Sequence, residues 1–69
     1  MYTRCFEKAS HIRKFTISSK GIGGWEVRDE QDSLVIRRVN YYDWHRVERA
    51  LRVFAIEAEM LQANGWNES

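Results

Sequence analysis

The stretch DWHRVERALRVFAIEAEMLQANGW, residues 43–66, predicts the longest element of this chain, an α-helix over residues 44–63. Asp43 suits the N-cap, because its carboxylate can accept hydrogen bonds from the free N–H groups of the first turn. Gly65 suits the left-handed residue that follows a helix, and Trp66 can then fold back on the last turn in a Schellman motif. The sequence therefore predicts both ends of the helix.

One face of this helix carries a continuous apolar stripe whose members recur every three or four residues. Its members are Trp44, Val47, Leu51, Phe54, Ala58 and Leu61. A stripe with this period is typical of a helix that covers the core of a small domain. The side chains expected to meet it are Phe15, Ile17, Trp25 and Val27.

The residues before the helix predict an antiparallel β-meander over residues 12–40. Residues 12–18, 25–28 and 34–39 are rich in β-branched and aromatic side chains, which favour strands. The segments between them are short and contain Gly, Asp and Ser, as turns between consecutive antiparallel strands do. The expected fold class is α+β, with a three-stranded antiparallel β-meander packed against one long C-terminal α-helix.

The register of the third predicted strand stays open at this point. Two sets of alternate residues can face the core: Leu34, Ile36 and Arg38, or Val35, Arg37 and Val39. A shift of one residue moves every side chain of a strand to the other face, so the two choices expose different charges.

Length and composition indicate one folded domain spanning residues 1–69, with residues 1–10 as an N-terminal segment outside the meander. The chain is 43% hydrophobic and 30% charged and has no proline, which argues against disorder. Cys5 is the only cysteine, and the two histidines lie far apart, so neither a disulfide within the chain nor a zinc site is expected. Small domains without such links are often stabilised by a partner subunit.

No apolar run of the sequence approaches the length of a membrane span, and the first residues lack the apolar core of a secretory signal. We therefore expect a cytoplasmic protein that does not enter a membrane.

A second apolar stripe lies on another side of the helix and has no partner among the predicted elements. It comprises Arg49, Val53, Ile56, Met60 and Ala63, our candidate protein interface. Such a row, flanked by charged residues, is typical of helix–helix association. The first possibility is antiparallel self-association into a homodimer, which sets arginines near the helix start against glutamates near its end. The N-terminal ten residues or a different protein could also cover the stripe.

Candidate catalytic groups are few and scattered. Asp43 and His45 lie two apart at the start of a helix, so their side chains point in different directions. Cys5 has basic neighbours but no identifiable base, and the glycines at 21–24 join two predicted strands rather than a strand and a helix. We expect no enzyme activity, no catalytic residue, no cofactor and no metal.

Basic side chains on the sheet face away from the helix offer an alternative, nucleic-acid binding. The candidate contacts are Lys14 and Arg28, together with Arg37 or Arg38 according to the register of the third strand. In element order alone, three strands followed by a helix resemble plant AP2-type and integrase N-terminal DNA-binding domains, a resemblance that implies a sheet inserted into the major groove. The acidic residues of 26–32 oppose a uniformly basic face.

The stretch GWEVRDEQDSLVIRRVNYYDWHRVERA resembles small bacterial sheet–helix domains of unknown function, and the similarity covers about residues 24–63. The resemblance implies a bacterial or phage source and carries no activity. The expected function is a non-catalytic interaction or regulatory module that associates with itself through the outer helix face.

Overall fold

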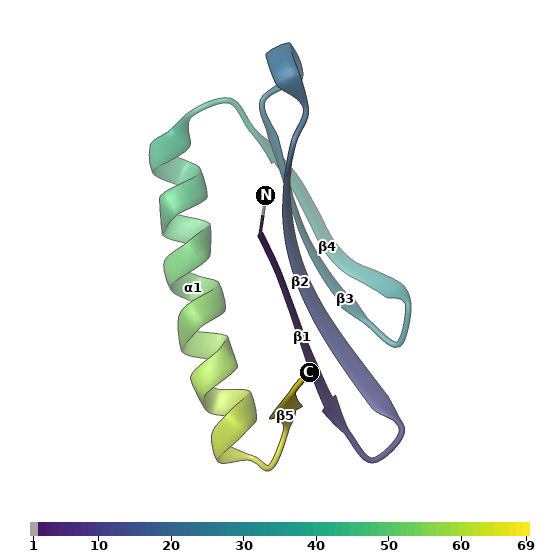
Figure 1. Cartoon of the computed structure of the whole chain (residues 1–69). Coiled ribbons are helices and arrows are strands. Elements are labelled where there is room, and N and C mark those ends of the chain that lie inside the picture. Colours follow the sequence, from purple (N-terminus) through teal and green to yellow (C-terminus); the bar gives the residue numbers. More distant parts are fainter. Residues whose placement is uncertain (1) are drawn as a thin grey trace.

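The computed structural model describes residues 2–69 as one five-stranded antiparallel sheet with a single long helix across one face (Figure 1). The elements are β1 Tyr2–Lys8, β2 His11–Ser19, the short 3-10 helix η1 Gly21–Gly23, β3 Trp25–Gln31, β4 Leu34–Tyr41, α1 Trp44–Ala63 and β5 Asn67–Glu68. The strands lie in the order β4-β3-β2-β1-β5. The α+β class is confirmed, whereas the three-stranded meander is wrong because two strands were missed.

The first missed strand, β1, occupies most of the segment predicted at residues 1–10, of which Met1 lies outside the described residues. β1 pairs with β2 along its whole length and places Phe6 in the core, with none of its surface exposed. The turn between β1 and β2 could not be predicted from residue types, because it contains no glycine, asparagine or aspartate. Ala9 adopts a positive φ of 54° there, a conformation that alanine rarely takes.

The second missed strand, β5, has only two residues and pairs with the outer edge of β1. Glu68 accepts two hydrogen bonds from the Arg4 guanidinium, at 2.8 and 2.6 Å. These bonds raise the pKa of Arg4 and lower the pKa of Glu68. Because the pKa of Glu68 is lowered, this link stabilises the fold at neutral pH and is lost as the pH falls through that lowered pKa.

The predicted helix over residues 44–63 is confirmed at both ends. The Asp43 carboxylate accepts a hydrogen bond from the His45 backbone N–H at 3.0 Å. At the other end Gly65 has a φ of 90°, and the N–H of Trp66 donates to the carbonyl of Leu61, as the Schellman motif requires. No helix within residues 2–69 is both long and apolar enough to cross a membrane.

The core lies where α1 crosses the middle of the sheet, and three aromatic contacts define it. The Phe54 ring stacks on Phe15 of β2 with centroids 4.6 Å apart, and on Tyr2 of β1 at 6.2 Å. Phe6 meets Phe15 edge to face at 5.9 Å. Val27 of β3 is also buried, so the helix is centred over β1, β2 and β3 rather than over β4.

Neither predicted register of the third strand holds along its whole length, because the pairing of β3 with β4 shifts between Asp29 and Glu30. Beyond the shift Arg37 is opposite Asp29 and Val39 is opposite Val27, on the helix side of the sheet. Before the shift Leu34 is opposite Gln31, which is also on the helix side. One extra residue on β4 therefore combines parts of both alternatives, as a β-bulge does.

Replacing Phe6 with alanine tests whether β1 belongs to the core. We expect Phe6→Ala to lower the free energy of unfolding by about 3–5 kcal/mol, because it leaves a cavity between two strands and the helix. Urea denaturation measures the change. The exposed Tyr42→Ala is the control and should differ from the parent by less than about 0.5 kcal/mol. Equal stability of the two variants would contradict the position of β1.

Replacing Ser33 with glycine tests the turn between β3 and β4. Asp32 and Ser33 have φ values of 52° and 70°, the two positive values of a type I′ turn. We expect Ser33→Gly to raise the free energy of unfolding by about 1 kcal/mol, because glycine adopts this conformation without strain. Ser10→Gly, at a turn residue without a positive φ, should give no gain; thermal denaturation of both variants decides the matter.

Candidate functional site

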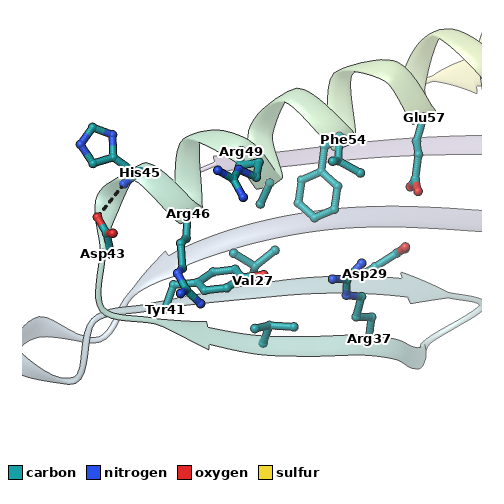
Figure 2. A pocket seen from close by; sticks show the side chains of 13 residues that line it. Val27, Asp29, Arg37, Tyr41, Asp43, His45, Arg46, Arg49, Phe54 and Glu57 are labelled. Atoms are coloured by element: carbon teal, nitrogen blue, oxygen red, sulfur yellow. Dashed lines mark hydrogen bonds between the residues drawn. The ribbon is translucent and has the colours of Figure 1, made fainter.

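A groove opens between α1 and the edge strand β4 (Figure 2). It lies on the face of the sheet that carries the helix, where α1 leaves β4 partly uncovered. Its volume is about 370 Å³. It is lined by Val27, Asp29, Arg37, Val39, Tyr41, Asp43, His45, Arg46, Arg49, Ala50, Val53, Phe54 and Glu57. The groove exists because the helix is centred nearer to β2, so β4 is left beside the helix rather than beneath it.

The walls of the groove carry three arginines. Arg46 and Arg49 come from α1, and Arg37 comes from β4 on the opposite wall. Figure 2 shows Arg46 extending from the helix toward Tyr41 on the sheet. Within residues 2–69 none of the three guanidinium groups forms an ion pair. The floor beneath them includes the apolar side chains of Val27, Val39 and Phe54 and the ring of Tyr41.

The acidic groups of the groove are engaged in the fold. Arg13 of β2 donates two hydrogen bonds to the buried Asp29 carboxylate, at 2.9 and 2.8 Å, and these bonds raise the pKa of Arg13. The Glu57 carboxylate lies 3.5 Å from the same guanidinium. Asp43 caps the helix. Within the described residues none of these carboxylates forms an ion pair with the three groove arginines, although Asp29 lies opposite Arg37 in the sheet.

The predicted interface stripe lies on the outer side of α1 and is open. Val53 is 42% exposed, Ile56 59% and Met60 60%, and Ala63 is exposed as well. The N-terminal segment cannot cover the stripe, because residues 2–8 form β1 within the sheet. Arg49 and Val53 line the groove in addition, so the stripe begins at the rim of the groove.

The four predicted nucleic-acid contacts do not lie on one surface. Lys14, Arg28 and Arg38 lie on the open face of the sheet, the face turned away from α1, whereas Arg37 lies on the helix side in the groove. Glu26 has carboxylate oxygens 3.7–3.9 Å from Lys20, Arg28 and Arg38. The basic charge of the open face is therefore largely compensated.

Two buried polar atoms near the centre of this open face, the Thr16 hydroxyl and the Arg28 Nε, form no hydrogen bond within the described chain.

The remaining titratable candidates are separate from one another. The Asp43 carboxylate binds the backbone of His45, while the imidazole is 89% exposed and points away from the groove (Figure 2). His11 lies 3.0 Å from Asp32, whose pKa it lowers. Cys5 is on the open face of the sheet opposite Lys14. Across residues 2–69 no three side chains of the usual metal ligands converge.

The groove was not predicted from the sequence, although some of its residues were noted for other roles. Arg49 and Val53 were predicted in the helix stripe, with Arg46 among the charges beside it. Either Arg37 or Arg38 was predicted on the opposite sheet face, according to the register of the strand, and Tyr41 had no predicted role. The three-residue spacing of Arg46 and Arg49 was a usable signal, because it places both side chains on one helix face. The opposing strand could not be identified without the strand order.

No protein-family model, curated protein or solved structure matches this chain. The functional proposal below therefore rests on the geometry and the chemistry of the residues of this chain.

Substitution of Arg13 tests whether the Arg13–Asp29 pair is a structural part of the groove. We expect Arg13→Met to lower the free energy of unfolding by about 3 kcal/mol, because the buried Asp29 carboxylate loses its partner. The double variant Arg13→Met with Asp29→Leu should recover most of this loss. Urea denaturation measures both, with Arg38→Met on the open face as the control. A loss no larger than in the control would show that Asp29 is not held by Arg13.

Proposed function

We propose that the protein is a non-catalytic interaction module that associates with itself through the outer face of α1. The observation that carries this proposal is the apolar row Val53, Ile56 and Met60, which stays 42–60% exposed in the folded chain. Burial of such an apolar row against a second surface lowers the free energy of the system, because it removes apolar surface from water. A bacterial or phage cytoplasm, where the single Cys5 stays reduced, is the proposed setting.

The charges beside the row favour a second copy of the same chain as the partner. Arg46, Arg49 and Arg52 lie toward the start of α1, whereas Glu57 and Glu59 lie toward its end. Two helices packed antiparallel across a two-fold axis bring the positive half of each against the negative half of the other. Parallel packing sets like charges together.

Nucleic-acid binding through the open sheet face is the weaker candidate. Lys14, Arg28 and Arg38 share that face with Glu26 and Glu30, and both carboxylates lie within 4.0 Å of arginine side chains. A surface whose arginines already have carboxylate partners attracts phosphates less strongly than a free one.

The proposal is tested by the solution mass of a variant that places a charge in the apolar row. We expect the parent to sediment as a dimer and Ile56→Glu as a folded monomer of about 8.3 kDa, because two buried carboxylates at a two-fold interface repel each other. Sedimentation equilibrium gives the mass, and circular dichroism shows that the variant is folded.

Ile22→Glu is the matched control, because Ile22 is a fully exposed apolar residue in η1, outside α1. This variant should keep the parent mass. A parent that is monomeric at all concentrations, or an Ile56→Glu variant with the parent mass, would remove the proposal.

A further inference from the structure

We propose that the groove between α1 and β4 binds a small organic anion, with a carboxylate or phosphate group attached to an apolar, planar body. The groove shares Arg49 and Val53 with the edge of the self-association surface, but the inference does not depend on self-association. The groove volume of about 370 Å³ lies within the range of small-molecule sites. Both parts of the ligand are argued from the lining of the groove.

The anionic group is argued from the arginines. Arg46 on the helix wall and Arg37 on the strand wall project from opposite sides, and neither has an ion-pair partner within the described residues. Guanidinium groups bind carboxylates and phosphates through paired N–H donors in a fixed plane. Asp29, which lies opposite Arg37 in the sheet, accepts its two side-chain hydrogen bonds from Arg13.

The apolar body is argued from the floor. Val27 and Phe54 are buried at 8% and 6% exposure, while Val39 and Tyr41 of β4 are only partly covered. A flat apolar group can therefore lie against β4 and remove these two side chains from water. The Tyr41 ring offers an aromatic surface for such a group. A simple inorganic anion leaves this floor exposed, which is why we infer an amphipathic ligand.

Arg46 and Arg37 differ from the arginines of the open sheet face in having no ion-pair partner within the described residues. An arginine beside an apolar surface usually finds a carboxylate or lies with its stem along that surface. On the open face of the sheet Arg28 and Arg38 both find Glu26. In the groove Arg37 and Arg46 form no ion pair within the described residues, so their guanidinium donors are available to an external anion.

The test is a heteronuclear NMR titration of the full chain with three probes that share a phenyl ring: phenylbutyrate, phenyl phosphate and the neutral phenylbutyramide. We expect saturable shifts in the backbone resonances of Val39, Ala50 and Phe54 with one or both anions. The amide should bind at least about 10-fold more weakly, because it lacks the charge that the guanidinium groups recognise. The comparison of phenylbutyrate with phenylbutyramide isolates the charge, because these two probes differ only in the carboxylate.

Matched arginine variants show whether the charge acts at the groove. Arg46→Gln and Arg37→Gln should each weaken binding of the preferred anion by about 10-fold. Arg52→Gln removes the same charge from the same helix outside the groove lining, and should change the affinity by less than about twofold. The three arginine variants and the protein without them can all be titrated in the Ile56→Glu background, so that self-association does not affect the result.

Three outcomes would overturn the proposal. The first is the absence of saturable shifts with either anion at millimolar concentration. The second is equal binding of the neutral amide, which indicates an apolar surface without charge recognition. The third is an equal effect of Arg52→Gln and Arg46→Gln, which indicates attraction by the overall charge of the protein.

Discussion

The stacking of Phe54 on Phe15 fixes the helix on the sheet, and the other surfaces of the molecule follow from it. The centroids of the two rings lie 4.6 Å apart, and the Tyr2 ring also stacks on Phe54 at 6.2 Å. This contact centres α1 over β2. The position of the helix over β2 decides which side chains are covered, and it leaves both the stripe on the outer side of α1 and the wall of β4 open to solvent.

The sequence predicted the helix because each of its ends is specified locally. Asp43 caps the start, and Gly65 with Trp66 ends it, within a few residues of the turns concerned. The strands β1 and β5 were missed for a physical reason. β1 is joined to β2 by a turn in which Ala9 adopts a conformation that its residue type does not favour, and the two-residue β5 pairs only with β1.

The groove could not be predicted because it depends on the missed strands. A sheet made of β2, β3 and β4 alone has β3 in its middle, and a helix centred there covers β4. Adding β1 and β5 beyond β2 moves the middle of the sheet toward β2 and uncovers β4. The stripe, in contrast, needed only the helix period, and its exposure agrees with the prediction. The β-bulge in β4 could not be predicted either, because it is defined by how β4 pairs with β3 and leaves no mark in the residue pattern of β4 alone.

The free edge of β4 has a consequence for how copies of the chain can meet. It begins with three exposed apolar residues, Leu34, Val35 and Ile36, and its outer backbone groups have no partner strand within the described chain. Such an edge is a template for fibril growth in many proteins. Arg37 and Arg38 follow at once and project to opposite faces, so a strand added in register meets a cation above and below. Charged residues that flank an apolar strand in this way oppose edge-to-edge pairing of sheets.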